Sequence, residues 1–291
     1  MRPEHIRWTP WLPHEGCWLG DILPKSPGLY RLRSQMCVGL CYIGQTGRTL
    51  KERMGALAPI YNSTQMPYRD PHTAGPGLWA LRELGAVFEV SVAEVPGDAP
   101  TRKGLECLVT SMHRQEHGRS PTLNFGRMPV GFKMSSANNR KLVEAGRRFR
   151  GGPSEERDSS HEPGVAPVGK LDGHLFGDIW CGHRWSPWTD IQSAINASGR
   201  GDSLYRIRGR GDDKLVYVGE GRVGKRLGDH IKKGRDPASP QGRFFAASGL
   251  QASWVMGSWM THQRLELECD LIAAHVLATG APPAAQFLGG R

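Results

Sequence analysis

The chain has 291 residues, with 38 lysines and arginines against 28 aspartates and glutamates, and a net charge of +10. This length accommodates two ordinary domains, and the basic balance favours a polyanionic partner such as nucleic acid, although charge alone does not choose a function. The sequence shows no signal-like segment and no apolar run of the roughly 20 residues that span a bilayer, so we expect a cytoplasmic protein with no membrane partner.

The first half of the chain predicts a small α/β unit. Its apolar patterns predict strands over residues 29–33 and 40–43, a helix over 50–57, a strand over 87–95 and a helix over 103–117. A further helix is predicted over residues 136–149. This segment can contact a phosphate backbone, although basic residues grouped in this way more often form only a solvent-exposed face of a helix. Its basic residues include Arg140, Lys141, Arg147 and Arg148.

A stretch poor in apolar residues separates the two halves, from Gly151 to Gly169. Its glycine, proline, serine and charged residues predict a flexible linker. We therefore expect a first domain over residues 1–150 that ends in the basic helix, a linker over 151–169, and a second domain over 170–291. Each domain should fold independently.

The second half predicts the same order of elements as the first. Strands are expected over residues 204–208 and 215–218, a helix over 223–233, a strand over 250–256 and a helix over 262–277. The expected fold is therefore α+β. Each half should contain a three-stranded, mainly antiparallel sheet packed with helices.

The two halves also repeat one another motif by motif, which indicates an internal duplication. In both halves the second of two strand tyrosines follows the first by twelve residues. The matched motifs are Trp8-Thr-Pro-Trp11 with Trp185-Ser-Pro-Trp188, Gly28-Leu-Tyr30 with Ser203-Leu-Tyr205, Tyr42-Ile-Gly44 with Tyr217-Val-Gly219, and Leu105-Glu106-Cys107 with Leu267-Glu268-Cys269.

Strand pairs that end in Tyr-Ile-Gly or Tyr-Val-Gly, followed by a helix arginine and a later helix glutamate, resemble the GIY-YIG nuclease superfamily. The resemblance covers about 100 residues of each copy. It implies two tandem small domains of this type. It also implies a metal-dependent endonuclease that hydrolyses phosphodiester bonds in nucleic acid, with DNA as the preferred substrate and Mg²⁺ or Mn²⁺ as the cofactor.

The resemblance assigns roles to matching residues of the two copies. Cutting a phosphodiester requires an activated water, a cation beside the phosphate and a stabilised leaving oxygen. The tyrosines would orient or deprotonate the water, the arginines would bind phosphate, and the glutamates would hold the metal. Strand packing and surface charge are the ordinary alternatives for these residue types. The residues are Tyr30, Tyr42, Arg53 and Glu106 in the first copy and Tyr205, Tyr217, Arg226 and Glu268 in the second.

The copies differ where the family commonly has a histidine or tyrosine one helical turn after the arginine. The second copy has His230 there, whereas the first has Leu57, for which Tyr61 or His72 could substitute from the following loop. Because leucine cannot transfer protons, we expect the second domain to be the better catalyst.

A late asparagine of the family is matched by Asn124 in the first copy, as a catalytic candidate, and is replaced by Gln286 in the second. Lys225 is a further candidate for contact with nucleic acid. The main alternative function is a non-cleaving DNA-binding or regulatory protein built from degenerate nuclease domains. A structural partner in a larger complex is a third.

Overall fold

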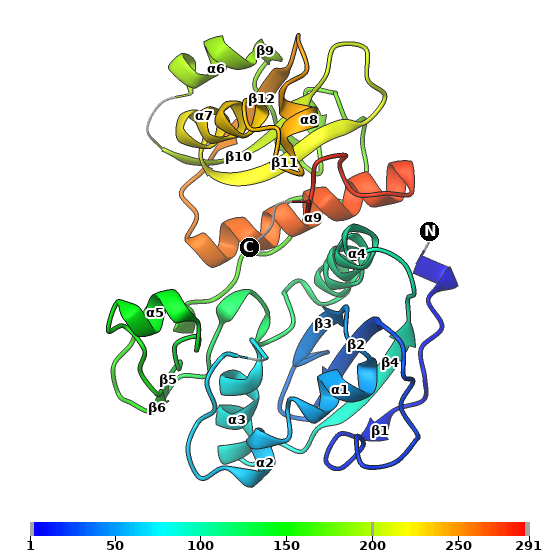
Figure 1. The fold of residues 1–291 in the computed structure, drawn as a ribbon, viewed down its shortest axis with the longest axis vertical. Helices are drawn as coiled ribbons and strands as arrows, with labels where there is room; N and C mark the ends of the chain where they lie inside the picture. Colours follow the sequence, from blue (N-terminus) through cyan, green and yellow to red (C-terminus); the bar gives the residue numbers. More distant parts are fainter. Residues whose placement is uncertain (1–2, 71, 199–200, 289–291) are drawn as a thin grey trace. The chain divides into compact units, whose positions relative to one another are not determined.

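The structure of the protein, a computed structural model, describes residues 3–70, 72–198 and 201–288. Contacts between residues divide the chain into two units, both drawn in Figure 1. Unit 1 comprises Asp98–Gly118 and Val165–Arg291 together with residues 1–3, and unit 2 comprises Glu4–Gly97 and Arg119–Gly164. Over the described residues, no helix combines the length and the apolar character that crossing a bilayer requires.

Unit 2 is built on an antiparallel sheet in the strand order β1-β4-β2-β3. Its strands are β1 (Leu12–Pro13), β2 (Gly28–Arg33), β3 (Tyr42–Thr46) and β4 (Glu89–Glu94). Between β3 and β4 lie α1 (Leu50–Gly55), α2 (Pro59–Asn62) and α3 (Gly75–Glu83). The shorter elements of this part of the chain are η1 (Pro3–His5), η2 (Asn124–Gly126), β5 (Phe132–Lys133), α5 (Arg140–Glu144), β6 (Gly152–Pro153) and η3 (Ser159–His161).

The start of α1 shows how local sequence positions the helix beside the sheet. Thr49 Oγ1 accepts a hydrogen bond from the Glu52 N–H, and the Glu52 carboxylate accepts one from the Thr49 N–H, which forms a capping box. Leu50 and Met54 of this helix then pack in the core with Tyr30 of β2. The cap and the apolar spacing therefore fix α1 on the tyrosine-bearing face of the sheet.

Unit 1 is built on an antiparallel sheet in the order β11-β10-β12-β9. Figure 1 shows this sheet between α7 and α9. The strands are β9 (Thr189–Asp190), β10 (Asp202–Arg208), β11 (Leu215–Arg222) and β12 (Gln251–Met256), and a separate hairpin consists of β7 (Ile179–Trp180) and β8 (His183–Arg184). The helices are α4 (Ala99–His117), α6 (Ile191–Ala197), α7 (Val223–Gly234), α8 (Gly242–Phe245) and α9 (Thr261–Thr279).

Both sheets have four strands in the same order, with β9, β12, β10 and β11 matching β1, β4, β2 and β3. The sequence predicts three strands per sheet, so this number is corrected to four. Each additional edge strand is two residues long and directly follows the second tryptophan of the repeated motif, with Leu12 after Trp11 and Thr189 after Trp188. A strand this short has no alternating pattern that a sequence could reveal.

The repeated tryptophans contact arginines of the central strands. The Arg206 guanidinium lies 4.4 Å from the ring centroid of Trp185 and 4.6 Å from that of Trp188. In unit 2, Arg31 lies 4.3 Å from the ring centroid of Trp8. Stacking of a guanidinium on an indole is favourable, and more so where water is excluded. These tryptophans thus cover the arginine-bearing face of each sheet.

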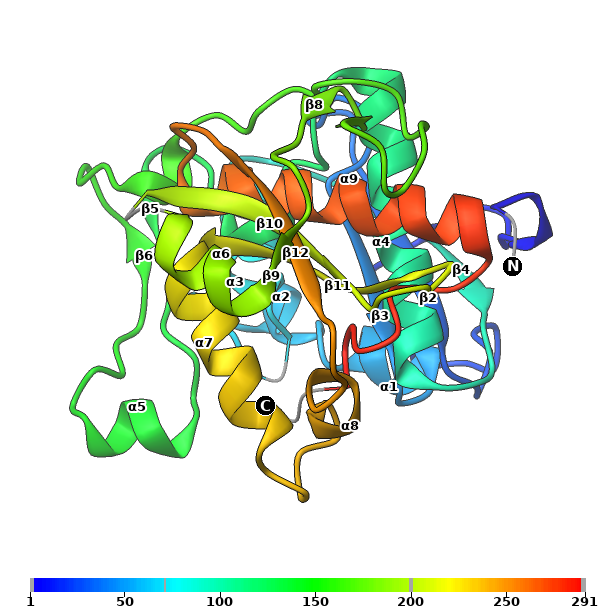
Figure 2. The ribbon, with the colours of Figure 1, turned by 90° about the horizontal axis from the view of Figure 1, so that it is seen from above.

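Unit 1 also contains α4, which comes from the first copy and packs against α9. Figure 2 shows the two helices crossing. Arg114 of α4 donates hydrogen bonds to both carboxylate oxygens of Asp270, at 2.9 and 3.0 Å, and lies 3.4 Å from Glu266. Removing one partner of a buried ion pair typically costs about 3–5 kcal/mol. The two units therefore do not meet at the boundary predicted at residue 150. Helix α4 lies before that boundary, but it belongs to unit 1 because it packs on α9.

Two further expectations differ from the structure. The basic helix predicted over residues 136–149 is confined to α5, between Arg140 and Glu144. The predicted linker contains β6 and η3 instead of being unstructured, and β6 pairs with β5. Backbone hydrogen bonds explain the order there, since the Ser154 N–H donates to the Gly131 carbonyl at 2.9 Å.

Candidate functional site

Five candidate side chains of the second copy lie on neighbouring elements of unit 1. Tyr205 lies on β10 and Tyr217 on β11. Arg226 and His230 lie on α7, and Glu268 lies on α9. Strand pairing and helix packing therefore bring together residues that span more than 60 positions of the sequence.

The two tyrosines stack because of the register of their strands. Tyr205 pairs with Gly219 across the β10–β11 ladder, and Tyr217 pairs with Ile207. The two tyrosine ring centroids are 6.1 Å apart at an interplanar angle of 24°, as expected for a diagonal cross-strand pair. A Cβ atom on Gly219 would lie 2.4 Å from the Tyr205 hydroxyl oxygen. The glycine of the Tyr-Val-Gly motif therefore provides the space for the Tyr205 ring.

His230 forms a hydrogen bond with Tyr205 from the second turn of α7. Its Nε2 lies 2.9 Å from the Tyr205 hydroxyl oxygen. Burial, together with the charges of Lys233 and Arg226, lowers the pKa of His230 to about 3, so the ring is neutral near pH 7. Its Nδ1 is buried and has no hydrogen-bond partner among the described residues. Neither tautomer is therefore fixed by a second contact.

Arg226 supplies positive charge to the same group. Its side chain forms a hydrogen bond with Tyr205. Burial raises the pKa of Tyr205 well above its usual value, and the Arg226 charge opposes that shift. The Nε of Arg226 is buried without a hydrogen-bond partner in the described part of the chain. A phosphate oxygen is a suitable acceptor for such a donor.

The carboxyl group of Glu268 is buried and interacts electrostatically with charged residues of the site. Its side chain is partly exposed, but burial of the carboxyl group raises its pKa to about 8. The negative charge of Glu220 raises this pKa further, and Arg226 lowers it. The carboxyl group is therefore largely protonated near neutral pH until a cation stabilises its ionised form.

In the second copy, the predicted metal would be held by this single carboxylate, as Glu106 would hold it in the first. Within the residues that the structure describes, no group of three or more His, Cys, Asp or Glu side chains is arranged to hold a metal ion. Mg²⁺ is nevertheless often bound through one or two carboxylates, with water and phosphate oxygens as its other ligands. The raised pKa of Glu268 fits such a site, because a cation would remove the cost of ionising it.

Unit 2 contains the same tyrosine pair with a histidine from a different element. The ring centroids of Tyr30 and Tyr42 are 6.0 Å apart at 26°. The Tyr30 hydroxyl oxygen lies 3.0 Å from Nε2 of His72, which precedes α3. The Ala74 N–H donates to His72 Nδ1 at 3.2 Å. The proton of the neutral ring is therefore on Nε2, and His72 donates its hydrogen bond to Tyr30.

The loop after α1 thus supplies the histidine that the helix lacks. Leu57 is buried in the core of unit 2. Of the two substitutes that the sequence offers, His72 contacts Tyr30, whereas the Tyr61 hydroxyl lies 2.8 Å from His14 Nδ1. Histidine therefore accompanies the tyrosine pair in both units.

The other two candidates of the first copy belong to different units. Arg53 lies on α1 in unit 2, where burial first and then the Arg53 charge lower the pKa of His72 well below its usual value. Glu106 lies on α4 and therefore in unit 1. Only the second copy has its tyrosines, arginine, histidine and glutamate within one unit.

Asn124 contacts the backbone of the strand that carries Tyr42. Its Oδ1 accepts a hydrogen bond from the Ile43 N–H at 3.0 Å, and its Nδ2 donates to the Ile43 carbonyl at 2.9 Å. Gln286 accepts a hydrogen bond from the Val218 N–H at the matching position of β11. Both amides therefore hold the middle residue of the Tyr-Ile-Gly or Tyr-Val-Gly motif, so the observed contacts of Asn124 position the strand, and its expected catalytic role stays a prediction.

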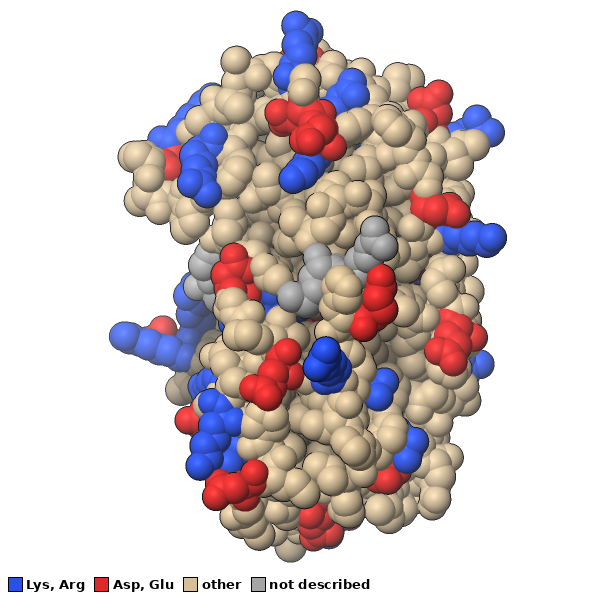
Figure 3. All heavy atoms as spheres, turned by 90° about the vertical axis from the view of Figure 1, so that its right-hand side faces the viewer, with Lys and Arg blue, Asp and Glu red and all other residues tan. Residues whose placement is uncertain are grey.

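The basic residues proposed for nucleic-acid contact are all exposed, whether on a helix or, for Arg147 and Arg148, beyond the end of α5. Arg140 forms an ion pair with Glu144 at 2.6 Å, and the Arg148 guanidinium lies 4.2 Å from the ring centroid of Tyr68. Lys141, Arg147 and Lys225 are also exposed. On the face drawn in Figure 3, basic and acidic side chains are interspersed. Lys141, Arg147 and Lys225 are therefore the better candidates for phosphate contact.

Arg264 is a site residue that the sequence argument missed. It lies one helical turn before Glu268 on α9, and its Nε donates to Glu220 Oε2 at 2.7 Å. Its NH1 lies 3.0 Å from Asp202 Oδ2. The internal repeat could have indicated this residue, because Arg102 precedes Glu106 by four residues just as Arg264 precedes Glu268.

Comparison with known proteins finds no relative: no family model, no curated protein and no solved structure matches the chain.

Proposed function

We propose that the protein is a metal-dependent endonuclease that hydrolyses phosphodiester bonds in nucleic acid, with DNA as its preferred substrate and the second copy as its principal catalyst. The observation that carries the proposal is the grouping of Tyr205, Tyr217, Arg226, His230 and Glu268 within unit 1. It combines a proton-transfer pair, a fixed cation and a carboxylate, which are the functions that phosphodiester hydrolysis requires.

The proton path begins at Tyr205. The attacking water gives a proton to the Tyr205 oxygen as that tyrosine passes its own proton to His230 Nε2, 2.9 Å away. The water oxygen bonds to phosphorus, the bond from phosphorus to the leaving oxygen breaks, and solvent protonates the leaving group. His230 is a weak base in the free protein, but the negative charge of bound phosphate raises its pKa.

Arg226 and Glu268 act on the phosphate. The Arg226 guanidinium hydrogen bonds to Tyr205 and stabilises negative charge as the water is deprotonated. Its buried Nε provides a donor for a non-bridging phosphate oxygen. Glu268 would hold Mg²⁺ or Mn²⁺, and the bound ion would offset charge on the phosphate.

The test compares Glu268→Ala, Glu106→Ala and the double variant on supercoiled plasmid with Mg²⁺, Mn²⁺ or EDTA. We expect metal-dependent cutting that Glu268→Ala lowers by on the order of 10²–10³-fold and that Glu106→Ala largely retains. If both copies cut opposite strands, each single change should convert linear product into nicked circle. Full activity of a folded double variant would remove both glutamates from the mechanism. DNA binding without cutting under any condition would establish the degenerate, non-cleaving alternative instead.

A further inference from the structure

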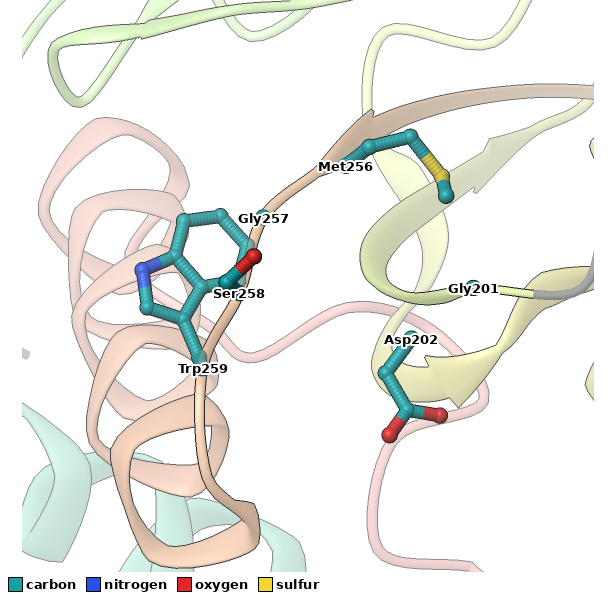
Figure 4. A pocket seen from close by; sticks show the side chains of 6 residues that line it. All are labelled: Gly201, Asp202, Met256, Gly257, Ser258 and Trp259. Carbon is teal, nitrogen blue, oxygen red and sulfur yellow. The ribbon is translucent and has the colours of Figure 1, made fainter.

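A pocket opens in unit 1 at the start of β10 and the end of β12. It is an open pocket of about 470 Å³, lined by Gly201, Asp202, Met256, Gly257, Ser258 and Trp259. Figure 4 shows the Trp259 ring and the Asp202 carboxylate on opposite sides of it. Pockets of roughly 300–1,000 Å³ bind small ligands, so this one accommodates a single nucleobase with part of its sugar.

Two glycines allow the pocket walls to form. A Cβ atom on Gly257 would lie 2.5 Å from the Trp259 ring, so this ring packs directly on the backbone. A Cβ atom on Gly201 would lie 2.4 Å from the Met256 methyl group. The Trp259 ring also makes an edge contact with His183 at 5.9 Å between ring centroids. The aromatic wall is therefore held in place before any ligand arrives.

The polar wall is linked to the candidate catalytic residues. Asp202 lies 3.0 Å from Arg264, and Arg264 donates to Glu220, whose charge acts on Glu268. Along β10, Asp202 precedes Tyr205 by three residues, or about 10 Å of strand. Because the two residues are three positions apart, their side chains leave opposite faces of the sheet, and a substrate strand that passes around the start of β10 can reach both the pocket and the catalytic residues.

We propose that this pocket binds an unpaired guanine of the substrate strand, an inference that rests on the proposed nuclease function. An indole ring stacks on any base, but a carboxylate accepts hydrogen bonds and donates none. The Asp202 side chain is 40% exposed, which leaves its carboxylate accessible to a ligand. Guanine alone among the DNA bases offers two adjacent donors, N1–H and the N2 amino group, on its Watson–Crick edge. Adenine and cytosine place an acceptor beside their single amino group.

The charge around the pocket agrees with a nucleotide ligand. Arg222 is exposed and pairs with Asp202 across the β10–β11 ladder, so both side chains belong to the same face of the sheet. Its guanidinium can contact the phosphate while Asp202 binds the base. Because the guanine edge is free only in unpaired DNA, the substrate class is single-stranded or locally opened DNA.

The experiment measures binding in EDTA, where no cutting occurs. The probes are fluorescein-labelled pentadeoxynucleotides of thymine that carry guanine, hypoxanthine or adenine at the centre, and the readout is anisotropy. We expect the guanine probe to bind at least about fivefold more tightly than the hypoxanthine probe, which lacks the N2 amino group. Trp259→Ala should weaken binding of the guanine probe by about fivefold to a hundredfold, the range produced by loss of one base stack.

Two further variants complete the experiment. Met260→Ala changes an exposed neighbour outside the lining and should leave affinity unchanged. Asp202→Asn should abolish the preference for guanine, and the comparison of probes on the unaltered protein remains decisive if that variant fails to fold. Equal binding of all three probes overturns the pocket assignment even if the protein cuts DNA. A guanine preference that Asp202→Asn removes, together with weaker binding in Trp259→Ala, supports the pocket even if no metal produces cutting, in which case only the nuclease function fails.

Discussion

The two tyrosine–histidine pairs have the same residue types and nearly the same geometry, yet only one of the histidines has its tautomer fixed by a second hydrogen bond. His72 lies 3.0 Å from Tyr30 and His230 lies 2.9 Å from Tyr205. His72 Nδ1 accepts a hydrogen bond from the Ala74 N–H, whereas His230 Nδ1 has no partner among the described residues. His72 is therefore fixed with its proton on Nε2, facing the tyrosine, and His230 is not.

This difference separates a hydrogen-bond donor from a base. A histidine that donates Nε2–H to tyrosine cannot accept the proton of that tyrosine unless it gives up its other contact. His230 can present a bare Nε2 to Tyr205. Leaving a buried ring nitrogen without a partner costs about 1–3 kcal/mol, and such a cost is commonly retained at functional sites. The second copy is thus better suited to proton transfer. Both units have a histidine beside the tyrosine, but only that of the second copy can present an unprotonated Nε2 without losing another hydrogen bond.

The largest effect that separates the copies is expected from replacing each histidine with glutamine. His230→Gln places a neutral amide beside Tyr205. Because an amide does not accept a proton as imidazole does, plasmid cutting should fall by on the order of 10²-fold. His72→Gln keeps an N–H donor that can serve Tyr30 and should cost less than about tenfold. The measurement is the initial rate of nicking and linearisation under saturating Mg²⁺. Similar losses in two variants with unchanged melting temperatures would show that the tautomer difference has no catalytic consequence.

A second comparison replaces the glycine under each tyrosine. A Cβ atom would lie 2.3 Å from the Tyr30 hydroxyl oxygen in Gly44→Ala and 2.4 Å from that of Tyr205 in Gly219→Ala. Overpacking of this kind costs about 1–3 kcal/mol of unfolding free energy. Urea melts should show the loss in both variants, and cutting should fall more in Gly219→Ala. Gly228→Ala, on α7 with open space around it, is the matched control and should not destabilise the protein.

A third comparison uses the pKa of Glu268, which burial first and then Glu220 raise to about 8. A raised carboxyl pKa contributes stability fully below the unfolded value of 4.5, and this contribution is lost as the pH rises through about 8. Mg²⁺ binds the ionised form, so it should raise the melting temperature more near pH 9 than near pH 6. Glu268→Gln should remove this pH-dependent difference. A Mg²⁺ effect that is equal at both pH values would argue against Glu268 as the ligand.

Much of the fold could be predicted from periodicity. Strands β2 and β10 and helices α7 and α9 have alternating or helical apolar patterns, and their expected ranges lie within a few residues of the observed ones. The edge strands β1 and β9 could not be predicted, because two residues have no period. The basic helix was predicted too long because Gly146, at φ 62°, ends it in a left-handed turn, and the Arg147 N–H donates to the Leu142 carbonyl at 3.0 Å.

The candidate site was predictable as residue types but not as contacts. The twelve-residue spacing of Tyr205 and Tyr217 indicated adjacent strand positions, and the register places the two rings together. The tautomer of His72 depends on the Ala74 N–H, a contact that only the path of the loop determines. The link from Arg264 to Glu220 likewise joins a helix to a strand 44 residues earlier, which no local pattern encodes.

The smallest expected effect concerns which unit contacts the DNA backbone. Exposed Lys141 represents unit 2 and exposed Lys225 represents unit 1. Each phosphate contact releases counterions, so the logarithm of the affinity should fall linearly with the logarithm of salt concentration, and loss of one contact should reduce that slope by about 1. If DNA lies along α7, Lys225→Ala should reduce the slope and Lys141→Ala should not, whereas reduction by both variants would place DNA on both units.

Lys25→Ala serves as the control, because Lys25 is exposed and already paired with Asp21 at 3.1 Å. An affinity that stays constant between about 50 and 200 mM salt would contradict binding through phosphates altogether, since six to ten such contacts lower affinity by about 10³–10⁵-fold over that range.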